Sequence, residues 1–231
     1  DQAVVVTACV QPDFSTNLLD RQLVALEEKQ IKPIIYFTKG DLVEEKQQPI
    51  FEEKVAGYRK IGYEVYLDWQ AFNGDAINNL TGDFADQLTI FMGQTGAGKS
   101  TLLNHIDPDL ALQTGEVSAA LNRGKHTTRK VALFPVGDGL VADTPGFSSY
   151  TVFEMRLEDL KSLFPEIANV GLNCRFRECL HINEPDCAVK EAVQNEEIMQ
   201  SRYDNYVQFF NIIKAQKPDY QRKGYSKKKG K

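Results

Sequence analysis

The octapeptide Gly93–Ser100 constrains this chain more than any other segment. It reads Gly-Gln-Thr-Gly-Ala-Gly-Lys-Ser, follows the apolar stretch Gln87–Met92 and precedes the helix-like stretch Thr101–His105. Glycines let a backbone wrap closely around phosphate oxygens, with several N–H groups pointing inward, and a following helix adds its positive end. A glycine-rich connector without a ligand is the alternative reading. The complete pattern between a strand and a helix favours a phosphate-binding loop.

The same pattern predicts the roles of Lys99 and Ser100, and it requires an acidic residue elsewhere in the chain to hold the metal ion. Lys99 can reach the β- and γ-phosphates, and the hydroxyl of Ser100 can ligate Mg²⁺. Asp143-Thr144-Pro145-Gly146 follows the apolar stretch Leu140–Ala142, where a carboxylate can hold Mg²⁺ and Gly146 can contact the γ-phosphate. The residues predicted to contact phosphates or their metal are Gly93, Gln94, Thr95, Gly96, Ala97, Gly98, Lys99, Ser100, Thr101, Asp143 and Gly146.

A second nucleotide signal lies earlier in the chain. Thr38-Lys39-Gly40-Asp41 follows the apolar stretch Pro33–Phe37 and is similar to the [NT]-K-x-D element that recognises guanine. The Asp41 carboxylate can accept hydrogen bonds from guanine N1–H and N2–H₂, and Lys39 can lie along the purine ring. Thr38 replaces the commoner Asn, which predicts weaker support for the neighbouring loop. Gln70 and Ala71 are the candidates for the backbone contact to guanine O6.

The pattern of apolar segments predicts an α/β fold. Strands are expected at Ala3–Val10, Pro33–Phe37, Glu64–Leu67 and Gln87–Met92, with a strand pair around Gly137–Gly139. Helical segments between them, one of them starting at a cap on Thr16 and another at Phe51–Ile61, imply a mainly parallel sheet. After about Tyr150 the strands end, and Asn195–Ile213 is expected to form a helix with aromatic side chains on its packing face.

Four potential metal ligands gather in that later segment: Cys174, Cys179, His181 and Cys187. Three thiolates and an imidazole make a closed tetrahedral set for a structural Zn²⁺, with no position left open for catalysis. Three buried free cysteines and a surface histidine are the alternative. The segment has few apolar residues, so metal binding would supply much of its folding energy.

Composition limits the remaining possibilities. The chain has 231 residues, of which 42% are hydrophobic and 26% charged, and its longest apolar runs are too short for a membrane helix. We expect no membrane partner and no secretion signal. The net charge is −5, yet Lys214–Lys231 contains eight basic residues and one acidic residue. This basic tail suggests contact with a polyanion, although a solvated end would have the same composition.

The order of these motifs is unusual, because the base element precedes the phosphate loop. In this it resembles the circularly permuted GTPases. Gly124-Lys125-His126-Thr127-Thr128-Arg129 and the Cys/His pattern extend the resemblance to the bacterial GTPases that depend on the small ribosomal subunit and assist 30S assembly. It covers almost the whole chain, from Asp1 to about Phe210. Members of that family carry an N-terminal OB-fold domain, and this chain begins where that domain would end.

The resemblance implies which residues act in catalysis and which residues bind Mg²⁺. Phe147 stands where many small GTPases carry the Gln that orients the attacking water, so the catalytic group is expected elsewhere. His126 is the best local candidate, and an exposed loop histidine or an RNA contact is the alternative. Thr128 is expected to be the second hydroxyl ligand of Mg²⁺, with Thr127 as the adjacent alternative. The catalytic set is therefore His126, Lys99 and Thr128, and the Mg²⁺ ligands are Ser100, Thr128 and Asp143.

The full expectation is a GTP-hydrolysing assembly factor whose nucleotide state controls binding to the small ribosomal subunit and its rRNA. A circularly permuted P-loop GTPase domain would span residues 1–153, a small helical zinc-binding domain 154–213, and a basic tail 214–231. The cofactors would be GTP or GDP, Mg²⁺ and one Zn²⁺ per chain, in a cytoplasmic monomer. A GTP-gated RNA-binding scaffold with incidental turnover, or a P-loop ATPase of another role, are the competing functions.

Overall fold

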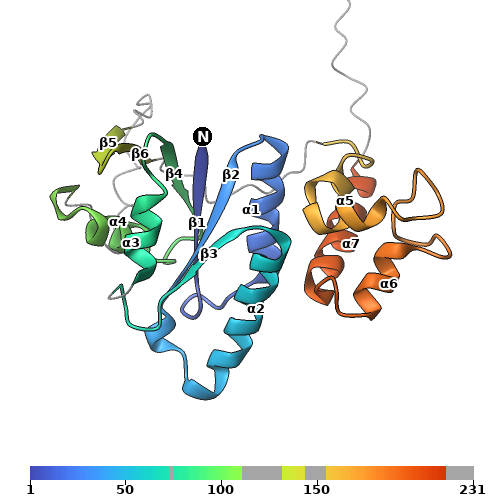
Figure 1. Cartoon of the computed structure of the whole chain (residues 1–231), viewed down its shortest axis with the longest axis horizontal. Helices are drawn as coiled ribbons and strands as arrows, with labels where there is room; N and C mark the ends of the chain where they lie inside the picture. The colour runs from blue at the N-terminus through green and yellow to red at the C-terminus, as the bar shows by residue number, and fades with distance from the viewer. Residues whose placement is uncertain (73–74, 111–131, 144–154, 217–231) are drawn as a thin grey trace, which may run out of the picture.

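A twisted sheet forms the centre of the larger, N-terminal part of the molecule (Figure 1). The computed structural model describes residues 1–72, 75–110, 132–143 and 155–216. Within these ranges six strands lie in the order β3-β2-β1-β4-β6-β5. The strands are β1 (Gln2–Ala8), β2 (Lys32–Thr38), β3 (Glu64–Leu67), β4 (Leu88–Met92), β5 (Ala132–Val136) and β6 (Gly139–Asp143).

Every pair of neighbouring strands is parallel except the last. β1 pairs with β2 on one side and with β4 on the other, so it occupies the middle of the sheet. β4 pairs in parallel with β6, whereas β5 and β6 form an antiparallel hairpin that turns at Gly137, whose φ is 56°. The expected mainly parallel sheet and its terminal hairpin are confirmed. The carboxyl ends of β1, β2, β3, β4 and β6 therefore lie at one edge.

Helices α1 to α4 lie between the strands in the sequence and cover the two faces of the sheet, whereas α5 to α7 follow the last strand. The helices are α1 (Thr16–Glu28), α2 (Gln48–Ile61), α3 (Asp75–Gly82), α4 (Lys99–Ile106), α5 (Pro165–Gly171), α6 (Ala188–Gln194) and α7 (Gln200–Ala215), with short 3₁₀ turns η1 (Gly40–Leu42), η2 (Glu45–Gln47), η3 (Pro108–Leu110) and η6 (Leu160–Leu163). The cap of α1 is Ser15 and not Thr16 as expected. Ser15 has extended backbone angles, and its Oγ accepts a hydrogen bond from the Leu18 N–H at 3.3 Å.

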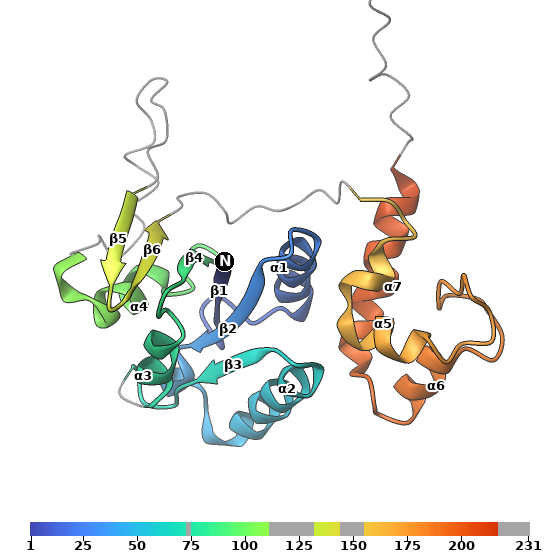
Figure 2. The ribbon, with the colours of Figure 1, turned by 45° about the horizontal axis from the view of Figure 1, so that its top comes forward.

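Side chains that point alternately to the two faces of the sheet explain why helices form a layer on each face. Val5 and Ile35 face the cluster that contains Leu23 of α1 and Val55 of α2. Their neighbours Val4 and Ile34 face the opposite cluster, which contains Leu80 of α3 and Leu102 and Leu103 of α4. Strands that are apolar on both faces must be covered on both, and a parallel sheet with helices on each side is the result (Figures 1 and 2).

The C-terminal unit, residues 155–216, packs beside α1 and α2 (Figures 1 and 2). It contains helices but no strand, in agreement with the sequence. The aromatic face of α7 serves packing, as expected, because Tyr206 and Phe210 are buried in the core of this unit. Val24 of α1 belongs to the same core, so the unit shares apolar surface with the sheet domain. None of the helices described is long and apolar enough to cross a membrane.

Candidate nucleotide and metal sites

The phosphate-loop sequence adopts the turn that its glycines permit. Gly93, Gly96 and Gly98 have φ values of 145°, 80° and 92°, a region that side chains with a Cβ rarely adopt. A Cβ on Gly93 would also lie 2.0 Å from the carbonyl oxygen of Val6. Gly98 is the N-cap of α4, and Leu102 N–H donates to its carbonyl at 2.8 Å. The loop therefore leads directly into a helix N-terminus at the end of β4.

Lys99 is the first residue of α4 and turns back over the loop. Its ammonium donates to the carbonyls of Gly93 at 2.8 Å and Gln94 at 3.2 Å. An ammonium has three donors in all, and this position places positive charge above the loop and beside the helix N-terminus. Ser100 follows in the first turn and is partly exposed. Both side chains predicted to serve phosphate and metal thus lie at the same end of α4.

The predicted base element follows β2 at the same edge of the sheet. Lys39 has left-handed backbone angles, and Gly40–Leu42 forms the turn η1. Gly40 is required here, because a Cβ would lie 2.3 Å from the carbonyl oxygen of Asp68. Asp41 is exposed to solvent, where its carboxylate is accessible to a ligand.

A hydrogen bond joins the two predicted elements. Thr38 is buried, and its Oγ1 donates to the carbonyl oxygen of Ala97 in the phosphate loop at 2.6 Å. Thr38 also lies against Gly98, where its side chain would be 3.6 Å from an added Cβ. Thr38 thus supports this loop directly, and the expectation that it does so more weakly than Asn stays a prediction. A hydroxyl at the end of β2 is close enough to donate to a carbonyl oxygen of the loop.

A third segment, Gln11–Phe14, was missed by sequence analysis. Lys39 Nζ donates to the carbonyl oxygen of Gln11. Pro12 lies beside the phosphate loop, with its Cδ 3.8 Å from the position of a Cβ on Gly96. Phe14 packs against Phe37, with ring centroids 5.4 Å apart. The segment follows β1, between the two predicted elements, and only the parallel order of β2, β1 and β4 indicates this.

The loop after β3 completes this edge. Asp68 Oδ1 accepts a hydrogen bond from the Gln70 N–H at 2.8 Å. Ala71 and Phe72 both have positive φ, at 50° and 66°, which is a strained conformation for residues with side chains. The Phe72 ring stacks on His105 of α4, with centroids 4.6 Å apart. The loop predicted to contact guanine O6 is thereby attached to the helix that follows the phosphate loop.

Other predicted site residues lie at the limit of the described ranges or beyond them. Asp143 ends β6, which is parallel to β4 with Ile90 beside Ala142, so its backbone lies next to the strand that leads into the phosphate loop. Gly146, Phe147 and the segment Gly124–Arg129, which includes His126, Thr127 and Thr128, lie outside the described residues. So does the basic tail beyond residue 216.

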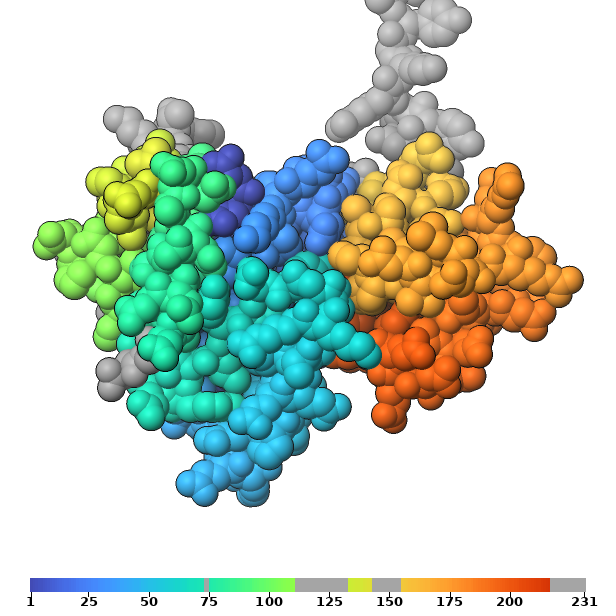
Figure 3. Space-filling view, viewed as in Figure 1, coloured from blue at the N-terminus to red at the C-terminus, as the bar shows by residue number. Residues whose placement is uncertain are grey.

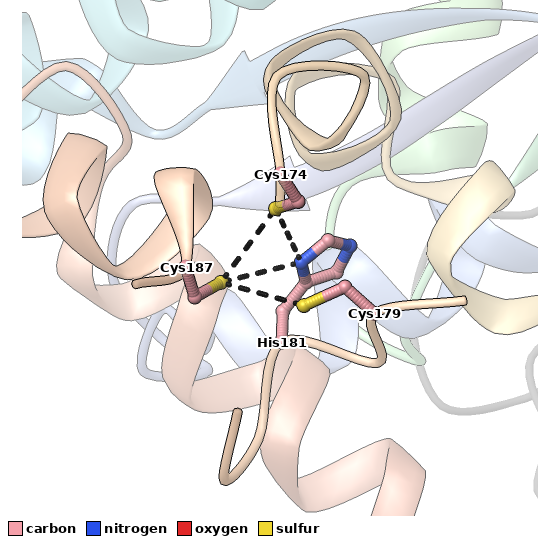
Figure 4. A group of neighbouring side chains, drawn as sticks. All are labelled: Cys174, Cys179, His181 and Cys187. Carbon is pink, nitrogen blue, oxygen red and sulfur yellow. Dashed lines mark hydrogen bonds between the residues drawn. The ribbon is translucent and has the colours of Figure 1, made fainter. Parts of the chain in front are cut away.

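The four predicted metal ligands do come together (Figure 4). Their ligand atoms all lie within 4.8 Å of one another. His181 Nδ1 is 3.5 Å from Cys174 Sγ and 3.4 Å from Cys187 Sγ. Cys187 Sγ is 3.9 Å from Cys174 Sγ and 3.8 Å from Cys179 Sγ. These sulfur atoms are too far apart for disulfides, which need about 2.05 Å.

The donor set and its spacing fit a tetrahedral zinc ion. Zn–S bonds of about 2.3 Å and Zn–N bonds of about 2.0 Å give edges near ~3.7 Å between sulfurs and ~3.5 Å from sulfur to nitrogen. Burial raises the pKa of the Cys179 thiol to about 12, with further contributions from Cys187 and Cys174. Burial and the nearby Lys161 lower the pKa of His181, which favours the neutral imidazole that metals bind. A cation would relieve the cost of placing thiolates here.

Neighbouring side chains fix the loop that carries these ligands. The Glu184 carboxylate accepts hydrogen bonds from the N–H groups of Leu180, Ile182 and Asn183, at 2.7, 2.9 and 3.0 Å. Burial would raise the pKa of Glu184, but these three donors outweigh it and hold that pKa below its ordinary value. The hydroxyl of Tyr203 donates to the carbonyl of His181 at 2.7 Å. The ligand loop is thus oriented by side chains that do not ligate.

The order of strands and sites defines the class. A base-recognition sequence at the end of β2 comes before the phosphate loop at the end of β4, and both lie at one edge of a doubly covered parallel sheet. This is the arrangement of a circularly permuted P-loop GTPase. The family model described as RsgA GTPase matches residues 1–153. The chain belongs to this family and is a GTP-hydrolysing enzyme.

Individual relatives agree with the family. A protein of Pediococcus pentosaceus named small ribosomal subunit biogenesis GTPase RsgA is 58% identical over 228 residues, covering 99% of this chain and 74% of that protein. Its namesake in Bacillus subtilis is 49% identical over 221 residues, covering 95% and 74%. The crystal structure of YloQ, titled a circularly permuted GTPase, has 44% identity and a TM-score of 0.78, covering 95% of this chain and 70% of that one.

A more distant solved structure has the same fold. YjeQ from Thermotoga maritima is 30% identical, with a TM-score of 0.80 over 94% of this chain and 72% of that one. The expected permuted fold and GTPase activity are confirmed, and the family excludes the alternative of an ATPase with another role. The relatives also confirm the expected connection to biogenesis of the small ribosomal subunit. The nucleotide of such an enzyme is GTP or GDP, with Mg²⁺.

Proposed function

We propose that this enzyme binds guanine through Asp41 and phosphates through Gly93–Thr101, and that its nucleotide state controls association with the small ribosomal subunit. The observation that carries the proposal is the 2.6 Å hydrogen bond between Thr38 and Ala97, which joins the base element to the phosphate loop. One nucleotide can span two elements held at this separation. The competing function is a GTP-gated RNA-binding scaffold in which turnover is incidental.

The base site uses three segments from one edge of the sheet. Asp41 accepts from guanine N1–H and N2–H₂, and Lys39 lies along the ring, held by the carbonyl of Gln11. Gln70 donates its N–H to Asp68 at 2.8 Å, so Ala71 is the better donor to guanine O6. This set prefers guanine because adenine lacks the paired donors that a carboxylate needs.

The phosphate side supplies charge and metal ligands. Lys99 neutralises the β- and γ-phosphates, and Ser100, Thr128 and Asp143 hold Mg²⁺. When bound, Mg²⁺ offsets the charge that develops on the phosphate oxygens. Gly146 senses the γ-phosphate, and His126 orients or deprotonates the attacking water. The domain boundaries that accompany this site are 1–153 for the GTPase domain, 154–213 for the zinc-binding domain and 214–231 for the basic tail.

The metal cluster is proposed to hold one structural Zn²⁺ per chain. All four ligands come from the protein, which leaves no open position for a substrate. The protein is proposed to act as a cytoplasmic monomer. The basic tail would add salt-sensitive attraction to rRNA phosphates, because each neutralised phosphate releases counterions.

Two measurements test the proposal. Asp41→Asn should weaken GTP affinity by about 1–3 kcal/mol, the value of a bidentate base contact, and should improve binding of xanthosine nucleotides. Unchanged GTP affinity would contradict the base site. GTP turnover and subunit affinity are then compared for purified 30S subunits with a GTP analogue and with GDP. Equal affinity in both nucleotide states and unstimulated turnover would reject the switch, whereas a difference in affinity without stimulated turnover would favour the scaffold.

A further inference from the structure

A buried ionic network joins the C-terminal unit to the GTPase domain. Arg202 of α7 and Asp20 of α1 are both fully buried, and their side chains are 2.8 Å apart between Nη1 and Oδ1. The two residues are separated by 182 positions in the chain. Burying a charge is costly unless it is paired and hydrogen-bonded, so this pair is an unusual feature of a domain junction.

Every oxygen of the Asp20 carboxylate has a partner. Oδ1 accepts from Arg202 and from the Tyr58 hydroxyl of α2 at 2.7 Å, and Oδ2 accepts from Asn205 Nδ2 of α7 at 2.6 Å. Asn17, in the first turn of α1, donates to Asn205 Oδ1 at 3.0 Å and to Gln208 Oε1 at 2.7 Å. The beginning of α1 is therefore attached to α7 by several directional bonds.

The charge of Arg202 is balanced from its own unit as well. Glu166 of α5 accepts from Nε at 2.6 Å and from Nη2 at 3.0 Å, and the Phe164 ring lies 4.5 Å from the guanidinium carbon. Burial alone would lower the pKa of Arg202, but the carboxylates of Asp20 and Glu166 outweigh it and raise that pKa above its ordinary value. The guanidinium remains charged, and it can satisfy all its partners only while α7 is docked on α1.

Helix α2 is held at the same junction. A Cβ on Gly57 would lie 2.2 Å from the sulfur of Met199, the residue before α7, so α2 and the C-terminal unit approach closely there. The space-filling view shows α2 and the C-terminal unit in contact along this side of the molecule (Figure 3). Tyr58, the residue after Gly57, donates to Asp20 as described above. One network thus fixes the positions of both helices.

Both helices lead directly to the proposed base site. Only Ser15 separates α1 from Gln11–Phe14, the segment in which the Gln11 carbonyl accepts from Lys39 and Pro12 lies beside Gly96. α2 follows Thr38–Asp41 through the short turns η1 and η2. By contrast, α4 and the phosphate loop lie on the other face of the sheet, in a separate apolar cluster. The junction is therefore connected to base recognition more directly than to the phosphates.

We propose that Arg202 and Asp20 are positioning residues for the base site, and that docking of the C-terminal unit slows the release of guanine nucleotides. The inference rests on the proposed base site. Docking holds α1, and α1 holds the segment that supports Lys39 and borders the phosphate loop. A contact that pulls the C-terminal unit from α1 would loosen this segment and speed release. By linkage, bound nucleotide would strengthen the docking in equal measure.

The test measures the dissociation rate of a fluorescent GDP analogue from the full chain. Arg202→Met should accelerate release about tenfold, within the roughly 5–150-fold range typical of coupling between sites. Arg202→Lys keeps the positive charge, so its rate of GDP release should lie between those of the parent and of Arg202→Met. Asn17→Ala removes two bonds at the junction without leaving a buried charge, and should accelerate release by about threefold, consistent with about 0.7 kcal/mol at 1.4 kcal/mol per tenfold. The Asn17→Ala variant still tests the inference if Arg202→Met fails to fold.

Two controls separate positioning from general destabilisation. Ser162→Ala removes one hydrogen bond inside the C-terminal unit, to the carbonyl oxygen of Asp159 at 2.6 Å, and leaves the junction network intact. It should release GDP at the parent rate. Over a range of GTP concentrations the junction variants should keep kcat within about twofold while KM rises, because Ala97 of the phosphate loop packs in the apolar cluster on the other face of the sheet. A purely structural defect would not separate the two constants.

The outcomes distinguish this inference from the proposed base site. If Asn17→Ala, or Arg202→Met where it folds, releases GDP at the parent rate, the inference is overturned. If Ser162→Ala accelerates release as much as the junction variants, the effect is general instability, which also overturns the inference. Asp41→Asn is included as a reference: if it leaves GDP release unchanged, the base site itself is wrong. Faster release in Asp41→Asn alone would reject only the role of the junction.

Discussion

The GTPase domain and the C-terminal unit are stable for different reasons. In the GTPase domain a six-stranded sheet has an apolar helical layer on each face. In the C-terminal unit α5 and α6 have only seven residues each, too short to be stable alone, and Cys179 and Cys187 are members of its core. The first unit is built by burying apolar area and carries its sites on loops, whereas the second includes its metal ligands in the core.

Their sites differ accordingly. The residues proposed to bind nucleotide lie on turns after β2, β3 and β4, and Asp41 among them is exposed. The metal ligands are mostly buried, with His181 only 2% exposed. A nucleotide at the first site would change what the enzyme does, whereas the zinc ion proposed for the second would stabilise the fold of the C-terminal unit. Four changes of decreasing size test this difference.

Loss of the metal should have the largest effect. Cys187→Ser, or treatment with a strong chelator, should unfold residues 155–216, because structural zinc supplies about 10–16 kcal/mol in small metal-dependent domains. Elemental analysis should find about one zinc ion per parent chain, and amide exchange should show loss of protection in α5–α7 only. Arg177, an exposed residue between Cys174 and Cys179 in the sequence, offers a control. Arg177→Ala should keep both the zinc ion and the protection of α5–α7 from amide exchange. A parent protein without zinc would contradict the assignment.

The second largest effect is expected from removing the positive charge of the phosphate loop, which should lower the rate of hydrolysis without lowering the stability of the fold. Lys99→Ala should lower kcat by about 10²–10³-fold, because it removes a positive charge aimed at the phosphates in the transition state. The melting temperature without nucleotide should change little, since the carbonyls of Gly93 and Gln94 that accept from Lys99 belong to the phosphate loop, outside the apolar core. Lys99→Arg is the matched variant that keeps the charge. A parent-like rate in Lys99→Ala would show that the loop does not serve catalysis.

A cavity in the GTPase core should cost about 2–5 kcal/mol of unfolding free energy. Leu23 is fully buried between α1 and the sheet, so Leu23→Ala leaves a cavity there. Urea unfolding measures the loss, and zinc content should stay the same. Leu42→Ala, at a side chain that is 52% exposed, is the control and should cost much less. Equal losses for both variants would show that the apolar layer is not the main source of stability.

The smallest effect is expected at the link between the two nucleotide elements. Thr38→Ala removes the hydrogen bond to Ala97 and should weaken GDP binding by about fivefold, equivalent to about 1 kcal/mol for one net hydrogen bond. Thr38→Ser keeps the hydroxyl and should bind almost as the parent does. Isothermal titration measures both. Affinity in Thr38→Ala equal to that of the parent would mean that the loop keeps its shape without this bond.

Sequence alone was enough for features that depend on a few neighbouring residues. The glycine pattern of Gly93–Ser100 predicts its turn because positive φ is accessible mainly to glycine, and three glycines there do adopt it. Glu64–Leu67 is predicted as a strand with the observed bounds. Cys174, Cys179, His181 and Cys187 could be grouped by residue type, since thiolates and imidazole share a preference for zinc. Family resemblance then supplied the permuted order and the activity.

Contacts between distant segments were decided by the tertiary structure. Nothing near Thr38 in the sequence indicates that it donates to Ala97, 59 positions away. The role of Gln11 follows from the central place of β1 between β2 and β4. Arg202 and Asp20 are ordinary charged residues in their own helices, and only docking of α7 on α1 buries them together. Local residue patterns determine turns and elements, but pairing across the chain depends on sheet order and helix packing, which bring together groups that carry no shared local signal.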